Sequence, residues 1–126
     1  MTEQSKERRS HPRISAEISG HIVCHTTKGA LQMTTRNISC SGLYCHVSEY
    51  IAPFTRVDIE MNLPLHQSGK AQHRAVRFEG VVVRAEPGHA HPSRTEFNVA
   101  IFFSGITPRA KSLVARYVRE HTEQKS

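Results

Sequence analysis

Residues 56–63 read RVDIEMNL, and this stretch decides the fold class. Every second residue in it is apolar: Val57, Ile59, Met61 and Leu63. Successive side chains of a β-strand point to opposite faces, so this period of two predicts a strand with one face in a core. Pro64 follows directly and is expected to end the strand, because proline has no backbone N–H to donate.

The same alternation recurs on both sides of this stretch. Residues 14–24 predict a half-buried strand, with these side chains on the apolar face: Ile14, Ala16, Ile18, Ile22 and Cys24. Further strands are expected over residues 30–38, 43–47, 75–85 and 95–103. Lys28-Gly29 and Pro87-Gly88 are expected to form turns, and the polar residues 66–73 an exposed connection.

The C-terminal segment has a helical pattern instead. Thr107 is suited to cap the helix and Pro108 to take its first position. One face then carries Ala110, Leu113, Val114, Tyr117 and His121, and this stripe is expected to pack on the sheet. Six strands without intervening helices predict an all-β fold with a C-terminal helix. Because antiparallel strands must protect their edges, we expect a six-stranded antiparallel β-barrel with the helix over one opening.

Length and charge bound the rest. The chain has 126 residues, a formal net charge of +6 and a pI near 9.7, which indicate one domain and an anionic partner. Residues 1–13 read as a flexible arm, 14–121 as the barrel with its helix, and 122–126 as a frayed tail. No apolar run approaches the ~18 residues of a membrane span and no signal peptide begins the chain, so we expect a cytoplasmic protein without membrane insertion. Its three cysteines lack CxxC spacing, which favours thiols over disulfides, and a chain of this size needs no cofactor for stability.

Two short segments are candidates for ligand binding. The first, RRSHPR at residues 8–13, precedes the first strand and contains Arg8, Arg9 and Arg13. Guanidinium groups donate paired hydrogen bonds to phosphate oxygens and stack on bases. Taken alone, the segment equally fits an ordinary basic arm.

The second segment, NISCSG at residues 37–42, lies between two predicted strands. Asn37 and Ser39 place an amide and a hydroxyl near the backbone. Gly42 permits a positive φ and the close approach of a ligand. Such residues are also common in any strand-to-strand turn, so this segment alone is equally well explained as a turn.

Together, RRxxxR, a strand and NxSxxG resemble the PilZ domain, the bacterial receptor module for cyclic diguanylate (cyclic di-GMP). In that family the arginines precede the first strand of a six-stranded barrel, and [D/N]xSxxG follows the second strand. The resemblance runs from about Glu7 to His121 and includes the segment FNVAIFF at residues 97–103. Ala100 departs from the pattern, since many members have glycine there.

The resemblance implies a role for each matching residue. Arg9 and Arg13 would contact phosphates and stack on or hydrogen-bond to guanine. In the family, an arginine at the position of Arg8 accompanies the binding of two intercalated ligand molecules. Asn37 and Ser39 would face a guanine edge and the adjacent backbone, while Gly42 would keep the pocket open. Arg84 falls where some members carry a ring-stacking residue.

The function implied is that of a non-enzymatic receptor. Ligand binding would fold the arm over the barrel and so regulate a separate effector protein that controls motility, biofilm formation or exopolysaccharide output. The ligand itself fits the charge, because cyclic di-GMP carries two phosphodiester charges and two guanines whose O6 and N7 accept hydrogen bonds from arginine.

Three other classes fit less well. The chain has nine histidines, but HExxH and paired CxxC spacings are missing, so no metal site is predicted. GxSxG and Gly-rich phosphate loops are missing too, so no catalytic residues are predicted. The alternative function is a basic small barrel that binds nucleic acid, which needs exposed aromatic residues for stacking. Aromatic residues make up only 6% of the chain, and Phe97, Phe103 and Tyr117 fall at predicted core positions, so no nucleic-acid partner is expected.

Overall fold

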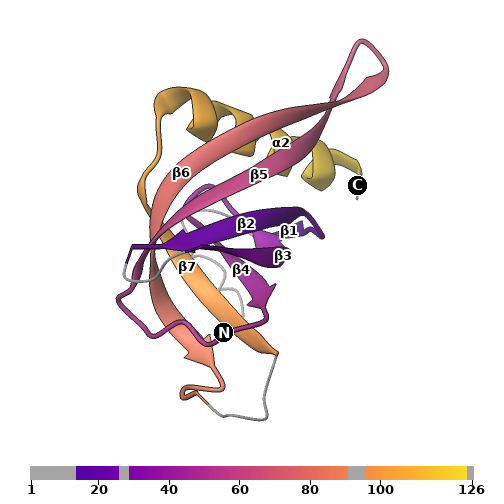
Figure 1. Ribbon diagram of the computed structural model, residues 1–126. Coiled ribbons are helices and arrows are strands. Elements are labelled where there is room, and N and C mark those ends of the chain that lie inside the picture. Colours follow the sequence, from indigo (N-terminus) through magenta and orange to yellow (C-terminus); the bar gives the residue numbers. More distant parts are fainter. Residues whose placement is uncertain (1–13, 26–28, 91–95, 125–126) are drawn as a thin grey trace, which may run out of the picture.

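A computed structural model of the chain describes residues 14–25, 29–90 and 96–124 (Figure 1). The predicted arm, residues 1–13, and the last two residues of the predicted tail lie outside this part of the chain. The described elements, in chain order, are β1 (Ile14–Ser15), β2 (Ser19–Cys24), β3 (Ala30–Ile38), β4 (Gly42–Val47), β5 (Arg56–Gln67), β6 (Lys70–Glu86), β7 (Phe97–Gly105) and the helix α2 (Pro108–Gln124).

Six of the strands close into a ring. The sheet runs in the order β3, β2, β5, β6, β7, β4, and β4 pairs again with β3, so that the ring has no free edge along these pairings. All pairings are antiparallel, and the short β1 adds to β3. The predicted six-stranded antiparallel arrangement with one C-terminal helix is therefore confirmed.

The core lies inside the ring and consists of the alternating residues that the sequence predicted. On β5, Val57, Ile59, Met61 and Leu63 are each at most 1% exposed. On the first segment, the predicted inward residues Ile14, Ala16, Ile18, Ile22 and Cys24 are all buried. The segment is not one strand, however, because residues 16–18 interrupt the ladder between β1 and β2.

Thr35 bridges this interruption from inside the core. Its Oγ1 accepts a hydrogen bond from the backbone N–H of Ile18 at 2.7 Å and donates one to the carbonyl of Ala16 at 2.6 Å. Thr35 is completely buried. A buried backbone group without a partner is costly, so this one hydroxyl replaces two ladder bonds that residues 16–18 do not make.

β5 and β6 form a long hairpin that projects beyond the ring (Figure 1). Two sequence predictions are wrong here. Pro64 does not end the strand, because it pairs with His73 on β6 beyond the stretch where β5 also pairs with β2. Its missing N–H therefore faces a free edge. Residues 66–73 are not a loop but continue both strands to a tight turn at Ser68 and Gly69, which both have positive φ, as hairpin turns of this kind require.

The helix begins as predicted. Thr107 Oγ1 accepts a hydrogen bond from the N–H of Ala110 at 3.1 Å, and Pro108 is the first helical residue. The helix packs against β5 and β6 and also touches β1. Its inward side carries Ala110, Val114, Tyr117 and Val118, all of them buried.

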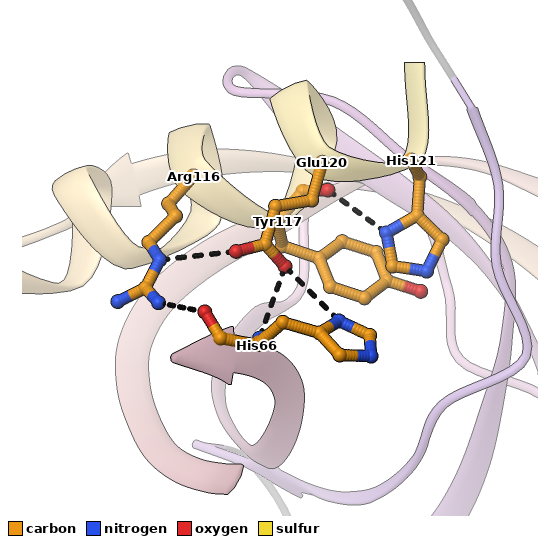
Figure 2. Close-up of polar contacts among 5 residues, drawn as sticks. All are labelled: His66, Arg116, Tyr117, Glu120 and His121. Carbon is orange, nitrogen blue, oxygen red and sulfur yellow. Dashed lines mark hydrogen bonds and ion pairs between the residues drawn. The ribbon is translucent and has the colours of Figure 1, made fainter. Parts of the chain in front are cut away.

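A polar cluster fastens the helix to the projecting hairpin (Figure 2). Glu120 accepts hydrogen bonds from the backbone N–H of His66 at 3.2 Å and from Nε of Arg116 at 3.1 Å. Arg116 also donates to the carbonyl oxygen of His66. Although burial by itself raises the pKa of Glu120, the hydrogen bonds from His66 and Arg116 hold it below its usual value. Beside this cluster, His121 stacks on Tyr117 with ring centroids 3.9 Å apart.

Candidate ligand-binding site

The candidate site lies on the outer face of the ring, across β3, β4, β7 and β6. The ladder registers place four residues side by side in one cross-strand row: Asn37, Tyr44, Ala100 and Arg84. Tyr44 and Ala100 point away from the core, because both of their neighbours along the strand are buried. Asn37 is half-buried and Arg84 is exposed, and each is followed by a buried residue, Ile38 or Ala85. The structure thus brings together Asn37 and Arg84, two predicted site residues that are 47 positions apart in sequence.

Two β-bulges aim these residues outward. On β3 the inward residues are Met33 and Thr35, then Ile38, and the register shifts between Thr35 and Asn37. On β6 the inward residues are Val82 and then Ala85, and the register shifts between Val82 and Arg84. Each bulge adds one residue and so reverses the alternation beyond it. Without the bulges, both site residues would point into the core.

The turn after β3 holds Asn37 and Ser39 in different ways. The Oδ1 atom of Asn37 is buried and has no hydrogen-bond partner. The hydroxyl of Ser39 is also buried, but it lies 3.2 Å from the Ser41 hydroxyl and accepts from the Ser41 N–H at 3.2 Å. Ser39 therefore stabilises the turn, whereas the Asn37 Oδ1 acceptor has no partner among residues 14–25, 29–90 and 96–124.

Gly42 does not use the positive φ that glycine permits, because its φ is not positive in the structure. A Cβ at this position would instead overlap the carbonyl oxygen of Ile101 on β7, which belongs to the backbone and has little freedom to move. The missing side chain thus allows β4 and β7 to approach each other beside the turn.

Arg84 belongs to a polar group with Tyr44 and Glu86. Its guanidinium carbon lies 5.8 Å from the centre of the Tyr44 ring, and its Nε lies 3.5 Å from Glu86 Oε2. The Tyr44 hydroxyl donates a hydrogen bond to Glu86 Oε1. This bond, with burial and the carboxylate charge, raises the pKa of Tyr44, so the phenol remains a donor. The arrangement orients the plane of Arg84 on an exposed surface where a base can stack.

Sequence reasoning missed a second row beside the first. Glu86, Asn98, His46 and Thr34 face one another across β6, β7, β4 and β3. Asn98 Oδ1 is buried without a hydrogen-bond partner, and His46 Nε2 lies 3.4 Å from Glu96 without hydrogen-bond geometry. The available signal was Asn98 itself, a polar residue flanked by Phe97 and Val99 in an apolar strand.

β1 links the start of the described chain to the NxSxxG segment. Ile14 pairs with Ile38 and Ser15 pairs with Asn37, although these pairs span 24 and 22 positions of sequence. Ile14 is the residue that follows the arginine motif in the sequence. Arg8, Arg9 and Arg13 themselves lie outside the described residues.

Comparison with known proteins identifies the family of the chain. The family model of the PilZ domain matches residues 7–120. The chain belongs to the PilZ domain family. No curated protein sequence matches it. PilZ domains are in general ligand-binding regulatory domains rather than enzymes.

Two solved structures share the fold of this PilZ domain. The Bacillus subtilis inhibitor of motility, MotI/DgrA, superposes with a TM-score of 0.74 at 17% identity, over 94% of this chain and 54% of that one. This chain therefore spans about half the length of MotI. The PilZ domain of Escherichia coli YcgR, solved with c-di-GMP, superposes with a TM-score of 0.61 at 16% identity, over 94% and 97% of the two chains.

The remaining surface features lie away from the motif residues of this PilZ domain. Hollows of about 400 and 520 Å³ lie along β2 and β5, and neither is lined by Asn37, Ser39, Gly42 or Arg84. We favour the outer-face rows over these hollows, because the rows hold the unpaired buried oxygens. No helix within the described ranges is both long and apolar enough to cross a membrane.

Metal-ligating groups gather at one place in the described chain. His25, Asp58 and Glu79 offer ligand atoms that lie within 4.8 Å of one another, and His25 Nε2 is 3.2 Å from Asp58 Oδ1. These residues come from three separate parts of the sequence, so a search for motif spacing does not find them. Exposed groups of this kind are common without an ion. Of the cysteines, Cys45 is in the core, where burial raises the pKa of its thiol to about 12.

Proposed function

We propose that this PilZ domain is a receptor for cyclic di-GMP and acts by binding rather than by catalysis. The observation that carries the proposal is the β1–β3 ladder, which joins the segment after RRxxxR to Asn37 of NxSxxG. Two motifs that are separate in sequence thereby lead to one surface. The relative YcgR, whose PilZ domain was solved with c-di-GMP, supports the identity of the ligand.

The chemistry of the surface suits this ligand. The arginines Arg9 and Arg13 would neutralise the two phosphodiester charges and bridge O6 and N7 of guanine. Asn37 Oδ1, buried and unpaired, would accept from a guanine N–H, and Arg84 would stack on a base. Ser39 would act indirectly, since its hydroxyl is engaged within the turn.

Arg8 bears on the number of ligands. In the family, an arginine at this position accompanies two mutually intercalated ligand molecules, so we propose a stoichiometry of two per chain. The bound ligand would draw residues 1–13 over the outer face. A surface altered in this way would be recognised by a separate effector protein, with motility, biofilm formation or exopolysaccharide production as the output.

Calorimetric titration with cyclic di-GMP tests the proposal. We expect saturable binding with two ligands per chain, and Arg13→Ala should abolish the heat or weaken affinity by at least about 100-fold, because it removes a charge-assisted contact to phosphate. The matched control is Arg109→Ala, which removes an exposed arginine from the helix and should bind as wild type. No heat from the wild-type protein at tens of micromolar ligand would overturn the receptor proposal, and one ligand per chain would overturn the intercalated dimer.

A further inference from the structure

The second outer-face row contains a buried acceptor that neither motif includes. Asn98 on β7 lies opposite Glu86 on β6 and His46 on β4. Its Oδ1 is inaccessible to solvent and has no hydrogen-bond partner in the part of the chain that the structure describes. A buried oxygen without a partner destabilises the free protein, and a ligand donor would supply the missing hydrogen bond. We propose that Asn98 and Glu86 together accept hydrogen bonds from the Watson–Crick edge of a guanine, so that this row selects guanine over adenine; the inference rests on the proposed function.

The acceptors match the donor pattern of guanine. The Watson–Crick edge of guanine presents N1–H and the exocyclic N2 amine, which are both donors. Adenine presents an acceptor at N1 and only one donor group, its exocyclic amine. Asn98 Oδ1 and the Glu86 carboxylate are both acceptors. An adenine would therefore place its N1 lone pair against them and leave a buried acceptor unpaired.

Glu86 is held in place for this role. The Tyr44 hydroxyl donates to its Oε1, and Arg84 Nε lies 3.5 Å from its Oε2. These contacts fix the carboxylate and offset part of its charge, yet each carboxylate oxygen retains a lone pair for a ligand N–H. Arg84 and Arg36 both lie close enough to Tyr44 for their charges to lower its pKa. Positive groups therefore lie near the Glu86 carboxylate, on the surface that we propose binds a dianionic ligand.

The position of Asn98 indicates a base other than the one that faces Asn37. Asn37 lies two strand spacings from Ala100, which is roughly 10 Å across the sheet. Asn98 lies two residues from Ala100 along β7, which is roughly 7 Å. The Cα atoms of the two asparagines are thus roughly 12 Å apart along the sheet. This distance exceeds the width of one base, so the two asparagines address two different guanines of the bound ligand.

Paired titrations with cyclic di-GMP and with the mixed cyclic GMP–AMP test the inference. We expect the wild type to prefer cyclic di-GMP, and we expect Asn98→Ala and Glu86→Gln each to weaken its binding by about tenfold while reducing the preference by a similar factor. Asn62→Ala, which removes an exposed asparagine from β5 outside both rows, is the control and should keep both affinities. Asn98→Ala should also leave the thermal midpoint of the free protein unchanged or raised, since it removes an unpaired buried group.

The outcomes separate the inference from the proposed function. If the wild type binds cyclic di-GMP and Asn98→Ala retains both its affinity and its preference over the mixed ligand, the role of Asn98 is refuted while the receptor function stands. If the wild type binds neither ligand, the receptor function fails first. A loss of binding in Asn98→Ala together with a lower thermal midpoint would also count against the inference, because it would assign Asn98 to the fold.

Discussion

Thr35 and Ile18 are joined by a buried hydrogen bond of 2.7 Å, from the Ile18 N–H to the Thr35 hydroxyl. The same hydroxyl donates to Ala16, so one side chain on β3 fixes the segment that leads from β1 to β2. β1 pairs Ser15 with Asn37 of the candidate site. The segment that carries this pairing thus depends on a residue inside the core.

Thr35→Val tests this dependence. Valine has nearly the same shape but leaves the Ile18 N–H and the Ala16 carbonyl without partners, so we expect a loss of about 2 to 4 kcal/mol in the free energy of unfolding. Urea denaturation followed by circular dichroism measures it. Thr34→Val, on the outward side of the same strand, should change stability by less than about 0.5 kcal/mol. Equal stability of Thr35→Val and wild type would show that the hydroxyl is dispensable.

Gly42→Ala should destabilise the protein even without ligand. The added methyl group meets the backbone carbonyl of Ile101, so β4 and β7 must move apart, at a cost of about 1 to 3 kcal/mol. Gly88→Ala is the matched control, because a Cβ there makes only an ordinary contact at 3.7 Å. Thermal unfolding of both variants distinguishes the two positions. If the Gly42→Ala variant is as stable as wild type, the contact with Ile101 does not require glycine, and ligand access is the only role left for Gly42.

Arg84→Lys should weaken cyclic di-GMP binding by roughly tenfold while preserving the charge. Lysine is a point charge and cannot present the flat guanidinium that stacks on a base. Arg77→Lys makes the same exchange at an exposed arginine paired with Glu60, away from the proposed site, and should bind as wild type. Calorimetry at two salt concentrations checks that both variants keep the same salt dependence. Wild-type affinity in Arg84→Lys would show that Arg84 contributes to ligand binding only through its charge.

The Glu120 cluster should make stability depend on acid pH. Its pKa is lower in the folded protein than the usual 4.5, so its stabilising contribution is complete above that value and is lost as the pH falls through the folded pKa. Glu120→Gln keeps an acceptor but removes the charge, and it should flatten the fall in stability between about pH 6 and pH 3. Glu17→Gln removes a carboxylate at an exposed position and should keep the wild-type slope. Identical slopes in Glu120→Gln and wild type would contradict the role of the cluster.

The core was predictable because it depends on local alternation. RVDIEMNL and the first segment both place their apolar residues inward as the period of two requires. The hairpin tip was not predictable by the same means. Next to the turn both faces of the hairpin meet solvent, as the exposed side chains of Lys70, Ala71, Gln72 and His73 show, so no burial imposes alternation there and the segment reads as a loop.

The candidate site was predictable only in part. The resemblance predicted Asn37 and Arg84 as site residues, but the row that they share depends on pairings between strands that sequence spacing does not reveal. Asn98 and Glu86 belong to no motif, and their significance appears only when β7 is placed between β4 and β6. Gly42 was identified correctly as a special position, yet its contact with Ile101 is a property of tertiary packing.

The two bulges restrict how the length of this chain can vary. Each adds one residue to its strand, and beyond each bulge a residue of the candidate surface, Asn37 or Arg84, points outward. A single-residue insertion or deletion in β3 or β6 would exchange interior and exterior side chains beyond that point. Related chains that keep this surface should therefore differ in length at the turn of the β5–β6 hairpin, where Ser68 and Gly69 are exposed, rather than within these two strands.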